Sequence, residues 1–255
     1  MINHSCTKDT NCNECTVRSR TLLGVVEDKN VRMTQHYRDK HHYFASGDIL
    51  HTEGQKIDYA FTVYSGCLIL YNNLKNGSRQ ILRVALPGDF VGFSRNNKGE
   101  LPYSIKAVTE VRICLFLDNS VQKMIREQPE IATRLIDLQL SDTILCQQRL
   151  VNLGQKSATE SLAYLIMELY SRIRVQYSTI FDSKLGVTFF PLNQEDMGDA
   201  LGLTKVHINR VITTFREQGL VSCGHKKIKV LNERKLSDIG QFDINLINDP
   251  FRHFS

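Results

Sequence analysis

The strongest constraint on the fold lies between Leu192 and Phe215, where two short amphipathic segments flank a glycine. Asn193 is a residue type that caps helix N-termini, and Gly202 can take the left-handed conformation that ends a helix. Thr204 can then cap a second helix. This pattern predicts a helix, a turn of three or four residues and a second helix, the arrangement that inserts its second helix into the major groove of DNA.

Helical spacing divides the second segment into two faces, of which the inward one carries the apolar residues Ile208, Val211, Ile212 and Phe215. The other face has residue types that read base edges, since arginine pairs with guanine, asparagine with adenine, and an exposed valine contacts a thymine methyl. The residues predicted to bind DNA from this helix are Thr204, Lys205, Val206, Asn209, Arg210 and Thr213.

The net charge of the chain is concentrated beside this motif. Residues 201–231 contain six of the basic residues and one acidic residue, Glu217, so they account for the whole net charge of +5. Residues 219–231 predict a strand, a tight turn and a strand, a wing whose basic tip contacts phosphate through Lys226 and Lys227. The alternative is a basic face that only contacts solvent.

Composition excludes several other classes of protein. With 42% hydrophobic and 23% charged residues the chain resembles an average globular protein. The longest apolar run, residues 60–71, is too short and too polar to cross a bilayer, and the N-terminus lacks a secretory signal. We therefore expect a cytoplasmic protein without membrane contact, whose seven cysteines are reduced or metal-bound.

The pattern before the motif predicts an α+β protein. Glycine turns every 8 to 12 residues indicate an antiparallel β roll, with Asn76-Gly77 as a type I′ hairpin tip. Helical patterns follow from Asp118. The predicted division is an N-terminal cysteine segment (1–40), a β-roll sensor domain (41–117), a dimerisation helix (118–153), a winged helix-turn-helix (154–235) and a tail (236–255).

The long helix predicted from Pro129 carries a candidate dimer seam. Residues on a spacing of three and four are typical of a helix that packs against another helix. The predicted seam consists of Ile131, Leu135, Leu138, Asp142 and Leu145. The alternative is an amphipathic helix that lies on its own β domain.

This order of elements resembles the CRP/FNR family of dimeric bacterial transcription regulators over about residues 44–231. The resemblance rests on Gly47-Asp48, Tyr64–Gly66, Leu86–Gly92, Ala158–Leu162 and Leu201–Arg210. It implies a cyclic-nucleotide-binding-like roll, a homodimer, sequence-specific binding of double-stranded DNA and contact with RNA polymerase.

Two departures from the family pattern qualify this resemblance. Val206 stands where many members have a glutamate, so the resemblance does not identify the operator. Residues 92–94 and 102–105 lack the Gly-Glu and Arg-Ser pairs of cyclic AMP binders, so the cation for a phosphodiester is missing. We therefore expect no binding of cyclic AMP.

The N-terminal cysteines offer a second kind of site. Cys6, Cys12 and Cys15 form C-x5-C-x2-C, a spacing that can supply soft ligands to an iron-sulfur cluster or zinc. By resemblance to oxygen-sensing FNR proteins, Cys114 matches a fourth ligand on the β roll, for a [4Fe-4S] cluster that senses oxygen or redox state. In the family the third N-terminal cysteine follows the pair, so Cys6 replaces it from the other side. Zinc, redox thiols, or no cofactor at all are the alternatives.

An enzyme is not expected, because the sequence has no G-x-S-x-G, P-loop or H-E-x-x-H motif. The leading hypothesis is a homodimeric DNA-binding transcription regulator. The alternative from another class is an iron-sulfur or thiol redox protein in which DNA contact is secondary.

Overall fold

The computed structural model describes residues 11–27, 30–31, 35–39, 41–93, 96–176, 187–224 and 227–245, with only the backbone described at 187–189, 223–224 and 227. The chain forms two compact units. The N-terminal unit comprises Met1–Asn72 and Leu82–Gln139, and the C-terminal unit comprises Asn73–Ile81 and Leu140–Ser255. Within the described ranges, no helix has the length and apolar character needed to cross a bilayer.

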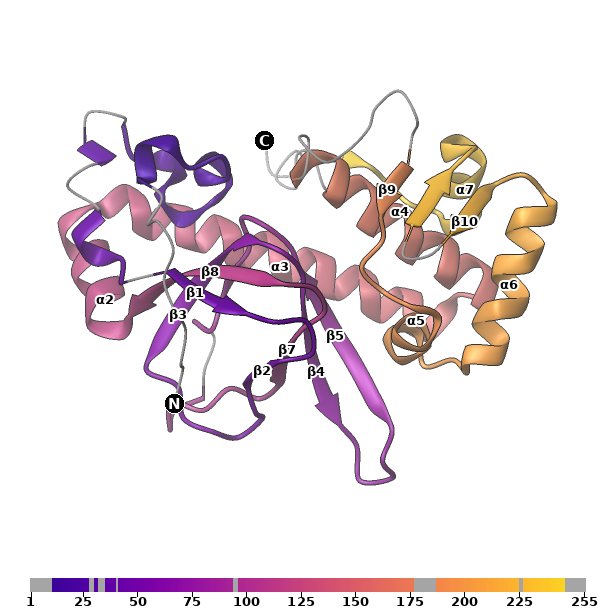
Figure 1. Cartoon of the computed structure of the whole chain (residues 1–255), viewed down its shortest axis with the longest axis horizontal. Helices are drawn as coiled ribbons and strands as arrows, with labels where there is room; N and C mark the ends of the chain where they lie inside the picture. The colour runs from indigo at the N-terminus through magenta and orange to yellow at the C-terminus, as the bar shows by residue number, and fades with distance from the viewer. Residues whose placement is uncertain are drawn as a thin grey trace. The chain divides into compact units, whose positions relative to one another are not determined.

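The N-terminal unit is built on a β roll of two four-stranded sheets, drawn in indigo to magenta in Figure 1. The strand orders are β1-β8-β3-β6 and β2-β7-β4-β5, and the registers that define them are antiparallel. Apolar side chains from both sheets, such as Phe61, Leu68 and Ile113, fill the space between them. The predicted antiparallel roll is therefore confirmed. The strands are β1 (His41–Phe44), β2 (Ile49–His51), β3 (Tyr59–Ser65), β4 (Leu68–Asn73), β5 (Arg79–Ala85), β6 (Phe90–Val91), β7 (Ser104–Ala107) and β8 (Val111–Leu117).

The connection between β4 and β5 differs from the predicted tight turn. Gly77 has a φ of 84°, but Gln241 is the only non-glycine residue in the described part of the chain with a positive φ, so Asn76 does not have one. A type I′ turn needs positive φ at both central residues. The chain instead makes a longer loop between Asn73 and Arg79, in which Asn76 Oδ1 accepts a hydrogen bond from Ser78 N at 3.0 Å.

The N-terminal segment packs as part of the core of its unit. It forms short 3-10 helices, and Leu22, Leu23 and Val26 join a buried cluster with Val121 and Met124. The sequence pattern does not reveal this because the apolar residues are few and lack a period. The short helices are η1 (Cys12–Glu14), η2 (Arg18–Arg20), η3 (Leu22–Val25) and η4 (Gln35–Tyr37).

Helices α2 (Asp118–Glu127) and α3 (Pro129–Gln155) follow β8. Ile131 and Leu135 are buried in the same cluster as the N-terminal segment, and Leu138 packs against it. The predicted dimer seam is therefore wrong at these three positions, where the helix lies on its own β domain. The apolar side chains of α3 that remain exposed are Ile136, Leu140, Leu150, Val151 and Leu153.

The C-terminal unit contains a helical group and a three-stranded sheet of order β10-β11-β9. Its last helix, α7, lies where a weakly patterned tail was expected. A Cβ at Gly240 would approach Tyr164 N on α4 to 2.6 Å, so only glycine allows this packing. The elements are α4 (Ala158–Gln176), β9 (Val187–Phe189), α5 (Gln194–Leu201), α6 (Lys205–Glu217), β10 (Val221–Gly224), β11 (Lys227–Val230) and α7 (Glu233–Gly240).

Candidate nucleic-acid interface

Helix α5 begins at a complete capping box. Asn193 Oδ1 accepts hydrogen bonds from the backbone N–H groups of Glu195 and Asp196, and the Asp196 carboxylate accepts one from Asn193 N at 3.2 Å. The helix ends at Gly202, whose φ is 65°. These are the start and the end that the sequence predicts.

The turn after α5 brings the backbone of the two helices together. A Cβ on Gly198 would lie 2.5 Å from Leu203 O, and Leu203 N donates a hydrogen bond to Gly198 O at 3.0 Å. Thr204 then caps α6, its Oγ1 accepting a hydrogen bond from His207 N at 3.2 Å. The position of α5 therefore fixes the point at which α6 starts.

Helix α6 has the two faces that its sequence predicts. Ile208, Val211, Ile212 and Phe215 are buried. The predicted DNA-binding residues of this helix are all exposed: Thr204 at the cap, then Lys205, Val206, Asn209, Arg210 and Thr213. The Val206 side chain is 64% exposed, beside the exposed Lys205 and Asn209. The helix thus presents cationic, amide and apolar groups together on one outward face.

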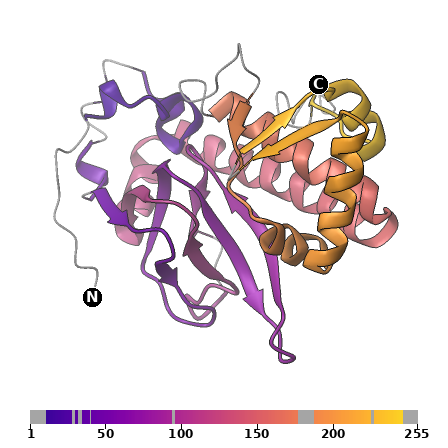
Figure 2. The same ribbon diagram turned by 45° about the vertical axis from the view of Figure 1, so that its right-hand side comes forward.

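A β hairpin follows α6 and lies beside it in Figures 1 and 2, as the contacts between α6 and β10 require. Strand β10 pairs with β11 in the register Val221↔Val230 to Gly224↔Lys227. The backbone of the predicted wing is therefore present, and β9 pairs with β11 as a third strand. Lys226 and the Lys227 side chain lie outside the described residues.

A buried ion cluster holds α4 within the C-terminal unit. Glu168 on α4 is 1% exposed, and its Oε1 lies 2.5 Å from Arg149 Nη2 and 3.6 Å from Arg172 Nη1. Burial alone raises the pKa of Glu168, but the two guanidinium groups outweigh it, so the pKa lies below its usual value. The carboxylate thus stays ionised and ties α4 to the C-terminal part of α3.

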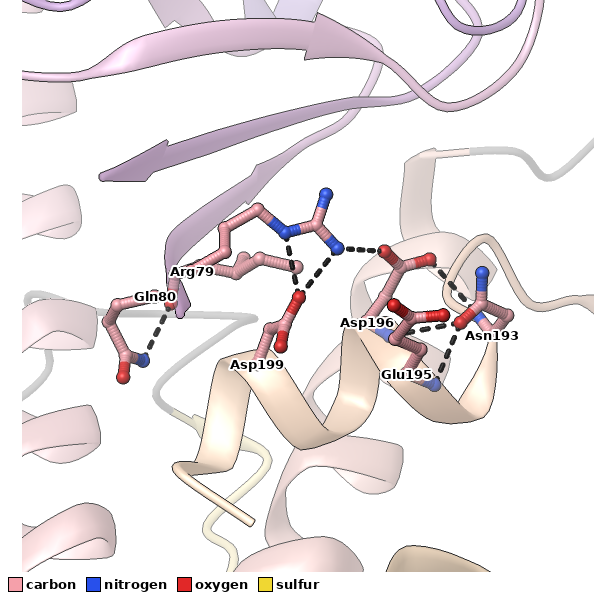
Figure 3. Close-up of polar contacts among 7 residues, drawn as sticks. Arg79, Gln80, Asn193, Glu195, Asp196 and Asp199 are labelled. Atoms are coloured by element: carbon pink, nitrogen blue, oxygen red, sulfur yellow. Dashed lines mark hydrogen bonds and ion pairs between the residues drawn. The ribbon is translucent and has the colours of Figure 1, made fainter. Parts of the chain in front are cut away.

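A contact that sequence reasoning missed lies on the first helix of the motif. Figure 3 shows Arg79, at the start of β5, directed at Asp196 and Asp199 on α5. About 120 residues separate the partners in the sequence, and no periodic pattern links them. Arg79 belongs to the same compact unit as α5.

In the N-terminal unit, three of the four predicted cluster ligands line one cavity. Cys12, Cys15 and Cys114 share it with Arg18 and Arg38. Cys6 lies outside the described residues. Cys12 and Cys114 are buried, and His41 is 4% exposed with its Nε2 3.1 Å from Cys114 Sγ.

The donor groups around this cavity suit a soft metal centre in part. Burial raises the pKa of the Cys114 thiol to about 12, and the nearby Arg38 acts in the opposite direction. Thr62 Oγ1, which lines the cavity, is buried and has no hydrogen-bond partner within the described residues. Across those same residues, however, no three His, Cys, Asp or Glu side chains are grouped closely enough to share a metal ion. The thiol chemistry fits a cluster, whereas a complete ligand set is not assembled.

Comparison with known protein families decides what kind of chain this is. Residues 41–128 match the cyclic nucleotide-binding domain, and residues 160–239 match the Crp-like helix-turn-helix domain. The chain belongs to the CRP/FNR family. As a CRP/FNR protein it is a DNA-binding transcription regulator.

Individual relatives of this CRP/FNR regulator agree with that assignment. The nitrogen fixation regulation protein FixK of Bradyrhizobium diazoefficiens is 27% identical over 88% of this chain and 92% of its own length. The transcriptional activator protein FnrL of Cereibacter sphaeroides is 25% identical over 90% and 92%. The solved structure of FixK2 from Bradyrhizobium japonicum matches with a TM-score of 0.70 and 22% identity, covering 78% of this chain and 96% of that one, which supports the fold. The named relatives are regulators of transcription rather than enzymes.

The family match to a cyclic nucleotide-binding domain leaves the ligand of this CRP/FNR roll open, and we predict that cyclic AMP is not it. Ser104, in the segment that corresponds to the phosphate-binding pair, uses its Oγ to accept a hydrogen bond from Glu53 N at 3.0 Å. Ser94 and Arg95 lie outside the described residues. Thermal unfolding with millimolar cyclic AMP should show an unchanged melting temperature, with 5′-AMP as the control. Saturation at 100 times Kd would add ~2.7 kcal/mol of stability, so a clear upward shift would contradict the prediction.

Proposed function

We propose that this regulator reads its operator through the exposed face of α6. Arg210 is assigned to a guanine, Asn209 to an adenine and Val206 to a thymine methyl group, in keeping with the hydrogen-bonding groups of the major groove. Lys205, Thr204 and Thr213 complete the face. Lys226 and Lys227 of the wing are proposed to contact phosphate, which positions the protein without specifying sequence.

The observation that supports this proposal most strongly is the separation of groups on α6. Its apolar residues are buried, while every predicted base-reading residue from Lys205 to Thr213 is exposed. Val206, 64% exposed next to an exposed arginine and asparagine, adds the apolar group that contact with a thymine methyl requires. We infer that the cover for this face is the edge of DNA base pairs.

Selection of duplexes from a random-sequence library tests this function without knowledge of the operator. The wild-type protein should enrich one motif, arranged as two half-sites whose centres are about one helical turn apart, because a dimer places its recognition helices in successive major grooves. Failure to enrich any duplex sequence would contradict the proposal.

We propose that the chain acts as a homodimer joined along α3, with a second copy of this chain as the occupant of its exposed stripe. Ile136, Leu140 and Leu150 are exposed by 59%, 46% and 65%, and their separations of four and ten residues place all three on one side of the helix. They lie on the helix face opposite Ile131, Leu135 and Leu138. In the proposed division of the chain, residues 41–117 sense, residues 118–153 dimerise and residues 154–235 bind DNA. The dimer works in the cytoplasm on double-stranded DNA, with RNA polymerase as its protein partner.

We further propose that the cysteine cavity holds the sensor as a [4Fe-4S] cluster, with Cys12, Cys15 and Cys114 as ligands and Cys6 completing the set. Such a cluster supplies a centre whose stability depends on oxygen and redox state. The chain contributes thiols held by the short helix η1 and by strand β8, and Arg38 lies next to Cys114 to compensate negative charge. Zinc or redox-active thiols in the same cavity are the competing assignments.

Anaerobically purified protein decides among these assignments. We expect visible charge-transfer absorption with iron and acid-labile sulfide in equal amounts, all lost in Cys114→Ser. Cys146→Ser is the matched control, since Cys146 is exposed on α3, outside the cavity. Stoichiometric zinc without sulfide, or metal-free thiols, would contradict the cluster. If DNA selection also failed, the alternative of a redox protein with secondary DNA contact would replace the leading function.

A further inference from the structure

The start of strand β5 holds the first helix of the helix-turn-helix. Arg79 Nε donates a hydrogen bond to Asp199 Oδ2 at 2.7 Å, and Arg79 Nη2 donates one to Asp196 Oδ1 at 2.7 Å (Figure 3). Gln80 Nε2 adds a hydrogen bond to Ala200 O at 3.2 Å. Arg79 and Gln80 therefore hold α5 at its first turn and again at its last turn.

These contacts are stronger than an ordinary surface ion pair. The side chains of Arg79, Asp196 and Asp199 are 21%, 11% and 26% exposed, so water screens their charges only in part. One guanidinium serves two carboxylates through separate N–H groups, which fixes its orientation as well as its distance. Fully exposed ion pairs contribute little to stability, whereas charge-assisted hydrogen bonds between partly buried groups contribute more.

The backbone connects these contacts on α5 to the recognition helix α6. Asp196 is both a partner of Arg79 and the carboxylate of the capping box that starts α5. Gly198, between the two aspartates, packs against the turn that starts α6. A displacement of α5 would therefore move or loosen the base-reading face of α6.

We propose that Arg79 is a positioning residue for DNA recognition, which holds α5 through Asp196 and Asp199 and so orders α6 before DNA arrives. Arg79 belongs to the stretch Asn73–Ile81, which is part of the same compact unit as α5 and α6. This inference rests on the proposed function of α6. No contact between Arg79 and DNA is required by it.

A charge effect and a positioning effect have different signatures. Arg79→Ala removes a cation and Asp199→Asn removes an anion, so a pure field effect would change DNA affinity in opposite directions. If α5 loses its fixed position, the specificity of DNA binding should fall in both variants. The positioning effect is measured by the ratio of the affinities for the selected operator duplex and a random-sequence duplex. The electrostatic field of a changed charge alters both affinities alike and leaves this ratio unchanged.

We expect Arg79→Ala and Asp199→Asn each to lower this ratio about tenfold, within the range of coupling between residues in contact. The double variant should lose no more than Arg79→Ala alone, because Arg79→Ala already breaks the contact with Asp199 that Asp199→Asn weakens. Lys75→Ala is the matched control: it removes one exposed cation from the loop before β5 and should leave the ratio within twofold of wild type. Opposite signs, additive losses or a ratio unchanged in Arg79→Ala would overturn the inference.

Amide hydrogen exchange gives a second measurement that does not depend on DNA. Arg79→Ala should speed exchange in α5 and at the start of α6 while leaving α4 protected. Unchanged protection of α5 would overturn the positioning role. If the wild-type protein selects no duplex, the function proposed for α6 fails, and exchange still decides whether Arg79 orders α5.

Discussion

Replacing Arg210 with alanine is expected to weaken binding of the selected operator by ~1–3 kcal/mol, which is about 5- to 150-fold in Kd. Arg210 is exposed on the outward face of α6, and a bidentate arginine contact with guanine is lost entirely on truncation. Affinity for a random-sequence duplex should change far less, because base contacts contribute little there. Fluorescence anisotropy titrations with both duplexes measure the two losses.

Two further variants separate base reading from general charge. Arg234→Ala removes the same charge from an exposed site on α7 and should leave the specificity ratio unchanged. Lys227→Ala, in the wing, should weaken both duplexes alike. Equal losses on the two duplexes for Arg210→Ala would remove this arginine from base reading.

The second large effect is expected at the dimer helix, where Leu140→Asp should weaken dimerisation at least about 100-fold. An aspartate in the apolar stripe would be buried against the second copy without a partner, which costs ~3–5 kcal/mol. Operator binding should fall with it, since two half-sites must be bound together. Sedimentation at micromolar concentration measures the monomer fraction.

Leu231→Asp is the matched control for this variant. Leu231 is 49% exposed, close to the 46% of Leu140, but it follows β11 and lies outside α3. It should leave the dimer intact. A Leu140→Asp protein that stays dimeric would place the interface elsewhere, while Leu138→Asp should lower the melting temperature, because Leu138 packs against the core of the roll.

Local features of the fold follow directly from the sequence. Asn193, Gly202 and Thr204 are residue types whose backbone preferences and side-chain oxygens define helix ends, and all three are found in those places. The faces of α6 follow from a single apolar stripe of helical period. Such predictions succeed because the interacting residues lie within a few positions of one another.

The dimer helix shows where this reasoning fails. Helix α3 carries apolar residues on two opposite faces, one from Ile131 to Leu138 and one from Ile136 to Leu150. Periodicity alone ranks them equally, and only the packing of the N-terminal segment on the first face identifies it as internal. The sequence therefore predicted a seam on the face that Ile131 and Leu135 bury within their own unit.

The periodic pattern of the sequence could not predict contacts between segments that are far apart in the chain. Arg79 meets Asp196 and Asp199, and His41 meets Cys114, across long stretches of chain. Each residue alone is an ordinary charged or polar residue. The antiparallel register of β1 and β8 pairs His41 with Cys114. The start of β5 places Arg79 against α5.

The central claim, that the exposed face of α6 reads a specific duplex sequence, is tested most directly by titrating wild-type protein against two duplexes of equal length over a range of salt. The selected operator should bind at least ~10³-fold more tightly than the random-sequence duplex. Both affinities should fall linearly with log salt as counterions are released. Equal affinity for the two duplexes at every salt concentration would contradict the account.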